Sequence, residues 1–245
     1  MRRHLGFVLF ALLLACAGVN AETLRMAANT WPPFTDARLT GDGLASELVR
    51  TALKRSGHVV EYAEVPWARA LRGLKMGDYD LLVSAWYSDE RARYGQFSKP
   101  YLTNRIRFLK RKGSAVDFQS LADLKRYSIA VGRGYRYQPE FDADTSLNKV
   151  PVADFPMAAR MLAAGRVQLA LEDELVARLY LNRELKGIGD QLEFLPKPLS
   201  ENGLHILVRR SHPQHQQLVD DFDRAIQAMR KDGTYQAIFA RHGLH

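Results

Sequence analysis

Residues 74–101 read LKMGDYDLLVSAWYSDERARYGQFSKPY, and the junction inside this stretch decides the fold. A helical pattern that includes Leu74 stops at Gly77, and the run from Tyr79 to Ser84 predicts a strand. Directly after Ser84 come an aromatic pair and a cluster of charged residues. A helix followed by a strand with polar and aromatic residues at its carboxyl end is typical of an α/β protein with a site there.

The same alternation of patterns extends over the whole chain. Strands are predicted at 23–28, 61–65, 79–84, 106–110, 128–131, 167–171 and 204–208. Helices are predicted at 44–56, 67–76, 120–125, 157–164, 173–184, 216–231 and 234–241. We therefore expect the α/β class, with mixed sheets flanked by helices.

The βα units on the two sides of residues 101–106 predict two lobes. No repeat or low-complexity linker divides them, so we expect a stiff hinge of two strands. The expected boundaries are 22–101 and 204–245 for lobe 1, 106–200 for lobe 2, and 102–105 and 201–203 for the hinge crossings.

The N-terminus has the pattern of a cleaved secretory signal peptide. The basic segment Met1–His4 precedes an uncharged run from Leu5 to Ala15, and small residues lead to Ala21. We expect cleavage after Ala21, leaving residues 22–245 in the periplasm. The segment Leu13–Cys16 also resembles a bacterial lipobox, so a lipoprotein modified at Cys16 is a second, lower-ranked possibility.

The composition limits the classes of function. Cleavage would remove Arg2, Arg3 and the only cysteine, so the formal net charge would fall from +8 to +6 and no disulfide would form. The basic residues are spread out rather than clustered, which indicates a solvated surface and not a nucleic-acid partner. We find no catalytic triad, Cys-His pair or metal-ligand spacing, so we expect no cofactor and no metal.

Seven segments, in this order, resemble the bacterial extracellular solute-binding proteins of family 3, the polar amino-acid type. They are WPPF (31–34), PW (66–67), LKMGDYD (74–80), SDER (88–91), FSKPY (97–101), GRVQLA (165–170) with Asp173, and MRKDGTY (229–235). The resemblance implies a type II periplasmic-binding-protein fold. It also implies a non-enzymatic protein that captures an amino acid or a related small carboxylate for an inner-membrane ABC permease. We expect a monomer.

The resemblance implies that two charged residues hold the ligand. Arg91 would pair with the ligand carboxylate, because a planar guanidinium offers two parallel charge-assisted hydrogen bonds. Asp173 would receive the ligand ammonium. Each residue has a simpler alternative. Arg91 could pair with Asp89 or Glu90 on the surface, and Asp173 could cap the helix that follows it.

Aromatic and loop residues complete the expected site. Trp67 takes the place of a family aromatic residue that packs on the ligand, and the other candidates lie in loops that follow strands. The candidates besides Arg91, Asp173 and Trp67 are Asn29, Trp31, Phe34, Ser84, Trp86, Tyr135 and Arg136.

Three departures from the family pattern leave the ligand unidentified. Trp86 and Tyr87 stand where small hydroxyl residues are usual, and Gly43–Ser46 lacks an acid near the first helix. Tyr135 and Arg136 follow a glycine turn where Thr or Ser is usual. Arg136 either adds a second positive charge, which would suit a ligand with more than one acid group, or points to solvent.

Two alternative functions stay open at this point. Some relatives with this fold are cyclohexadienyl or arogenate dehydratases, and Glu172 or Asp173 could donate a proton if burial raised its pKa. The protein could also be a sensor module that presents its closed form to a membrane receptor.

Overall fold

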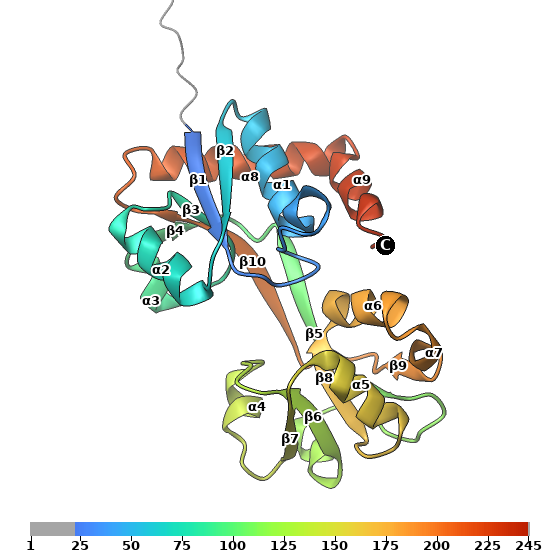
Figure 1. Cartoon of the computed structure of the whole chain (residues 1–245). Helices are drawn as coiled ribbons and strands as arrows, with labels where there is room; N and C mark the ends of the chain where they lie inside the picture. Colours follow the sequence, from blue (N-terminus) through green and yellow to red (C-terminus); the bar gives the residue numbers. More distant parts are fainter. Residues whose placement is uncertain (1–22, 245) are drawn as a thin grey trace, which may run out of the picture.

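A computed structural model describes residues 23–244 as two lobes joined by two long strands (Figure 1). The predicted signal peptide, the cleavage after Ala21 and the possible lipid site at Cys16 lie outside the described residues. Within 23–244, none of the helices combines the length and the apolar character needed to cross a bilayer.

Lobe 1 contains a mixed sheet with the order β2-β1-β3-β10. Strands β1 (Thr23–Ala28), β2 (Val59–Glu64) and β3 (Leu81–Trp86) are parallel, and β10 (Ser200–Arg209) pairs antiparallel with β3 and with the short β4 (Gly95–Phe97). The flanking helices are α1 (Leu44–Arg55), α2 (Trp67–Met76), α3 (Asp89–Ala92), α8 (His215–Lys231), α9 (Thr234–Arg241) and the 3-10 turn η1 (Thr40–Asp42).

Lobe 2 continues the same sheet in the order β5-β8-β6-β7. Strands β6 (Ser128–Gly132), β7 (Asn148–Val152) and β8 (Leu169–Asp173) are parallel, and β5 (Leu102–Arg111) is antiparallel to β8 and to β9 (Leu192–Phe194). The helices are η2 (Leu121–Arg126), α4 (Pro139–Ala143), α5 (Phe155–Ala163), α6 (Glu174–Arg183) and α7 (Lys186–Gly189).

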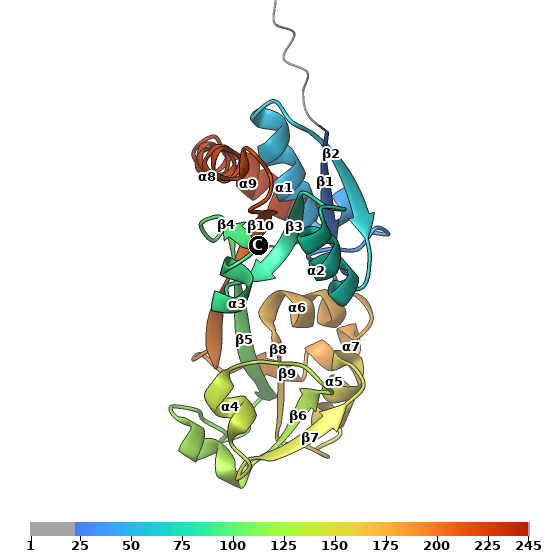
Figure 2. The same cartoon turned by 90° about the vertical axis from the view of Figure 1, so that its left-hand side faces the viewer.

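The two lobes are connected by the pairing of β5 with β10. The antiparallel register runs from Ser200 opposite Ile106 to Leu204 opposite Leu102, so the hydrogen-bonded ladder passes through the predicted hinge crossings. Helix α6 of lobe 2 adds a second connection, because Leu175, Val176 and Tyr180 pack against the hydrophobic core of lobe 1. Figure 2 shows α6 between the two lobes.

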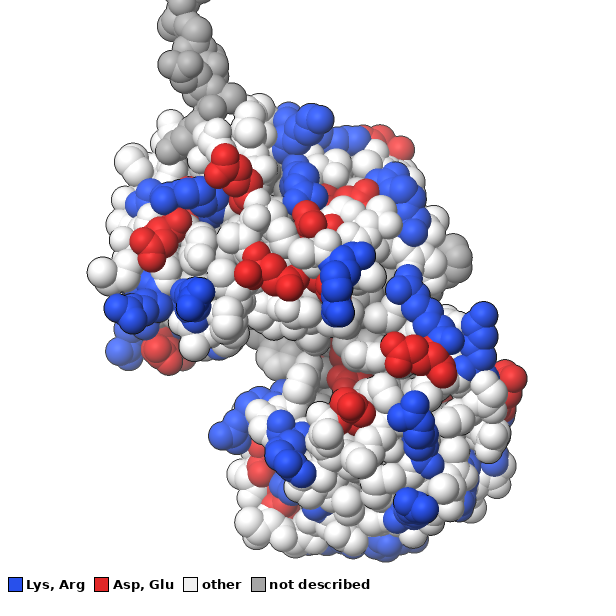
Figure 3. Space-filling view, viewed as in Figure 1, with Lys and Arg blue, Asp and Glu red and all other residues white. Residues whose placement is uncertain are grey.

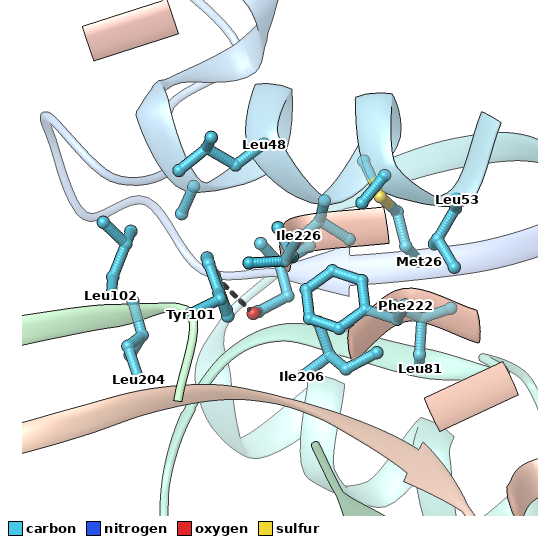
Figure 4. Packing of buried hydrophobic residues seen from close by; sticks show 14 of the residues in the cluster. Met26, Leu48, Leu53, Leu81, Tyr101, Leu102, Leu204, Ile206, Phe222 and Ile226 are labelled. Carbon is cyan, nitrogen blue, oxygen red and sulfur yellow. Dashed lines mark hydrogen bonds between the residues drawn. The ribbon is translucent and has the colours of Figure 1, made fainter. Parts of the chain in front are cut away.

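Tyr101, at the start of the hinge, is anchored in the core of lobe 1 (Figure 4). Its buried hydroxyl donates a hydrogen bond of 2.8 Å to the Val83 carbonyl, and its ring lies 5.5 Å from that of Phe222 in an edge-on arrangement. Its carbonyl accepts hydrogen bonds from Tyr235 Oη and Arg230 Nη2. Strand β5 therefore leaves lobe 1 from a fixed point.

The structure corrects several predicted elements. Strands β3 and β8 lie two residues later than the sequence patterns indicated, so Trp86 and Asp173 belong to strands. The patterns also missed the short elements α3, α4, α7, β4, β7 and β9. Strand β7 contains Pro151, which argues against a strand in sequence, but β7 is at the sheet edge, where proline is tolerated.

Charged side chains of both signs are interspersed over the face shown in Figure 3, and a hollow separates the two lobes. This face therefore presents no continuous basic surface of the kind that binds nucleic acid.

Candidate ligand-binding site between the lobes

A cavity of about 340 Å³ lies between the lobes, a volume in the range typical of small-molecule sites. Its walls come from the carboxyl ends of β1, β3 and β6 and from the starts of α2 and α3. The lining residues are Asn29, Trp31, Trp67, Ser84, Trp86, Arg91 and Leu204 from the lobe 1 side and Gly134, Tyr135 and Arg136 from lobe 2.

Eight of the predicted site residues thus meet at one cavity, and two do not. Phe34 is fully buried beneath Trp31, with their ring centroids 4.5 Å apart, because its backbone closes a tight turn on the Trp31 carbonyl. Asp173 has no exposed surface and lies outside the cavity lining.

Arg91 lines the cavity and is half-buried. Its Nη1 donates a hydrogen bond of 2.8 Å to the Trp86 carbonyl, and its guanidinium carbon lies 5.3 Å from the centroid of the Trp67 ring. In the described part of the chain, no carboxylate lies within ion-pair distance of Arg91. The surface alternative is not what the structure shows, because Asp89 accepts a hydrogen bond from Tyr87 and Glu90 lies beside Lys75.

Aromatic rings form much of the remaining wall. The rings of Trp31 and Trp86 meet edge-on with centroids 6.1 Å apart. Tyr135 faces them from lobe 2. Burial raises the pKa of Tyr135 well above its usual value, and the neighbouring carboxyls of Glu172 and Asp173 add to the increase, whereas a hydrogen bond with Trp31 opposes it. The cavity is therefore lined by flat aromatic surfaces from both lobes.

Asp173 is the N-cap of α6. Its Oδ1 accepts hydrogen bonds from the backbone amides of Leu175 (2.9 Å) and Val176 (3.1 Å), which is the capping role considered for it in the sequence. Its Oδ2 accepts a hydrogen bond of 3.1 Å from Asn104 Nδ2. Burial raises the pKa of Asp173 to about 6, although these donors favour the ionised form.

Asn104 joins Asp173 to the cavity wall. Its Oδ1 accepts a 2.7 Å hydrogen bond from Trp86 Nε1, and an indole nitrogen can only donate, so the amide nitrogen of Asn104 must face Asp173. The result is a continuous chain of hydrogen bonds from Trp86 in lobe 1, through the hinge strand β5, to α6 in lobe 2. This connection was not predicted.

Glu172 is a second buried acid beside the site. Its Oε1 accepts a hydrogen bond of 2.9 Å from the amide of Asp173, but burial dominates and raises the pKa of Glu172 to about 8. The next acid, Glu174, is paired with Arg107 at 2.9 Å and Arg178 at 2.7 Å. Hydrogen bonds with these two arginines lower its pKa despite partial burial.

Sequence reasoning missed three residues at or beside the site, namely Leu204, Gly134 and Asn104. Gly134 belongs to the glycine turn that precedes Tyr135, and Leu204 begins a predicted strand. For Asn104 a signal was present, because Leu102, Asn104 and Ile106 alternate on one face of a strand. A polar residue between two apolar ones on a buried face is expected to have a specific hydrogen-bond partner.

Comparison with known proteins confirms the expected two-lobe fold. The model of the family described as "Bacterial extracellular solute-binding proteins, family 3" matches residues 24–245. The L-cystine-binding protein TcyJ of Escherichia coli (strain K12) is 28% identical over 215 residues, which cover 85% of this chain and 77% of that protein. The putative ABC transporter arginine-binding protein 2 of the same strain is 26% identical over 242 residues, 95% of this chain and 96% of that protein.

A solved structure extends the comparison to three dimensions. The L-cystine solute receptor of Neisseria gonorrhoeae, in its unliganded open conformation, matches with a TM-score of 0.71 and 24% identity. The match covers 91% of this chain and 93% of that one.

Replacing Asn104 with leucine should destabilise the protein, because Trp86 Nε1 loses its acceptor and Asp173 Oδ2 loses a donor. The buried Asp173 Oδ2 left unpaired, together with the partly buried Trp86 Nε1, costs about 1 to 3 kcal/mol in the free energy of unfolding, measured by urea denaturation. The control is Asn202→Leu, since Asn202 lies directly opposite Asn104 in the β5–β10 ladder and is partly exposed. Equal losses in the two variants would contradict the hydrogen-bond chain.

Glu172→Gln should change how stability depends on pH. The pKa of Glu172 is about 8 in the folded state and about 4.3 in an unfolded chain. The stabilisation from its protonated form is therefore complete below the unfolded pKa and is lost as pH rises through 8. The free energy of unfolding of the variant minus that of the wild type should therefore increase by about 2 kcal/mol or more between pH 5 and pH 9. The exposed Glu184→Gln should follow the wild type, and a constant difference for Glu172→Gln would refute the buried protonated acid.

Proposed function

This chain belongs to family 3 of the bacterial extracellular solute-binding proteins, and we propose that it captures a small carboxylate-bearing solute, an amino acid or a close relative, in the periplasm. The two lobes close on the solute, and an inner-membrane ABC permease receives it. The site residues proposed for this role are the cavity residues predicted from the sequence, with Arg91 as the carboxylate anchor.

Arg91 is the observation that carries the proposal. A guanidinium that is half-buried in an aromatic wall loses part of its hydration, and no protein carboxylate among the described residues compensates it. One of its N–H groups is used by the Trp86 carbonyl, which fixes the side chain and leaves other donors for a ligand. Ser84 supports the same assignment, because its Oγ is buried at the cavity with no hydrogen-bond partner in residues 23–244.

Closure of the lobes on the solute is expected because both lobes contribute residues to the cavity lining. A solute held by Arg91 from lobe 1 and by Tyr135 and Arg136 from lobe 2 would favour the arrangement in which both walls touch it. Binding energy and lobe closure would therefore be coupled, with the β5–β10 pair as the element that bends. A periplasmic receptor domain is the alternative partner to a permease, since either could recognise the closed form; co-purification with one or the other separates the two.

A role for Asp173 in binding a ligand ammonium depends on its hydrogen bond with Asn104. Its second oxygen already accepts from Asn104, so a ligand ammonium would have to replace that hydrogen bond or share the oxygen. A carboxylate can accept several donors, and sharing would keep the chain from Trp86 intact.

Arg91→Ala and Arg91→Lys should both abolish ligand binding, the second because an ammonium cannot make two parallel hydrogen bonds to a carboxylate. A bound ligand at a hundredfold excess over its dissociation constant raises the unfolding free energy by about 2.7 kcal/mol, which a thermal-shift screen of amino acids and dicarboxylates detects. The control is Arg93→Ala, an exposed arginine two residues away that does not line the cavity. A hit that survives Arg91→Ala would refute the anchor.

An enzymatic function has one observation in its favour, because Glu172 keeps its proton near neutral pH, as a general acid must. Glu172 is absent from the cavity lining, however, so it lacks a path to a bound substrate. We therefore expect no phenylpyruvate from prephenate in a direct assay. Turnover that disappears in Glu172→Gln would establish the dehydratase alternative instead.

A further inference from the structure

The charges that line the cavity are both positive and come from opposite lobes. Arg91 stands on α3 of lobe 1, and Arg136 follows the turn at the end of β6 in lobe 2. Gly134 has φ of +75°, a conformation that glycine adopts readily, and this turn carries the chain from β6 to Arg136. Arg133, in the same turn, is exposed and does not line the cavity. Of the two arginines Arg133 and Arg136, only Arg136 therefore lines the cavity.

Nearby acids do not neutralise these two cations. Asp173 uses its oxygens to cap α6 and to bind Asn104, and Glu172 is buried and does not line the cavity. Glu174 is held between Arg107 and Arg178. Within residues 23–244, Arg136 has neither an ion pair nor a hydrogen bond through its side chain. The cavity thus has an uncompensated positive charge at two points.

Two guanidinium groups at one cavity repel each other, although only moderately, because Arg136 is exposed and Arg91 is half-buried. A solute with one carboxylate removes only part of this repulsion. We propose that the natural ligand carries two carboxylate groups, one bound by Arg91 and the other by Arg136. This inference rests on the proposed function, in which Arg91 holds a carboxylate.

The same charges determine what the site rejects. A solute with a cationic side chain would place a further positive charge between Arg91 and Arg136, with no free carboxylate in the lining to receive it. The part of the ligand between its carboxylates would instead pack against Trp31, Trp86 and Tyr135, which favours an uncharged linker. The preference therefore differs from that named for the arginine-binding relative.

Calorimetry on the mature chain, freed of ligand by unfolding and refolding, tests the inference with matched pairs of solutes. One pair is L-glutamate and L-glutamine, and the other is L-cystine and L-cystine monoamide; the members of each pair have the same number of ammonium groups and differ in having two carboxylates or one. The two-carboxylate member of at least one pair should bind about ten- to a hundredfold tighter, the range expected for hydrogen bonds to a charged group. L-arginine should bind more weakly than either member of that pair.

Arg136→Gln should remove the difference within the pair and leave the one-carboxylate member within about threefold of its wild-type affinity, because only the second carboxylate loses its partner. The matched control Arg133→Gln should preserve the difference. Equal affinities within both pairs, or an equal loss for both members in Arg136→Gln, would overturn the second carboxylate site. If binding of those solutes still disappears in Arg91→Ala, the proposed function stands. Failure of every tested acid to bind would overturn both.

Discussion

The arrangement of the site depends on the antiparallel pairing of β5 with β10. Strand β10 pairs with β3 of lobe 1, and β5 pairs with β8 of lobe 2. One ladder of backbone hydrogen bonds between β5 and β10 therefore connects the two lobes. Tyr101 fixes the start of β5 in the core of lobe 1. The ladder also carries Leu204, which lines the cavity, and Asn104, which lies beside it. The distance between the two walls of the site is therefore set by the hinge and not by the loops alone.

Much of this could be predicted from the sequence, because local patterns determine where strands end. Asn29, Trp31 and Ser84 were placed at the site by their positions after or within strands, and Arg91 by the resemblance of its segment to the family. Helices with a clear apolar stripe, such as α8, were also predicted within a residue or two. The class of fold, the two lobes and most of the cavity residues came from such signals.

The remaining features depend on contacts that no local pattern contains. Asn104 and Asp173 are 69 residues apart, and their hydrogen bond exists only because Ile106 of β5 pairs with Asp173 of β8. The burial that raises the pKa of Glu172 has the same origin, since β8 is covered on both faces. Short elements such as β4 and β9 form because long neighbours offer hydrogen bonds, and three residues carry too little periodicity to be recognised.

Trp86 was noticed in the sequence, but its contacts are seen only in the structure. In sequence it was only a bulky departure from the family pattern, but in the structure its carbonyl fixes Arg91 and its indole nitrogen binds Asn104. One residue thus connects the proposed carboxylate anchor to the hinge and, through Asn104, to Asp173. Asp173 is buried and lies outside the cavity lining, so the charged side chains in that lining are those of Arg91 and Arg136. Trp86 at one side of the cavity and Arg136 at the other are thus the two residues on which the proposed preference for a second carboxylate depends.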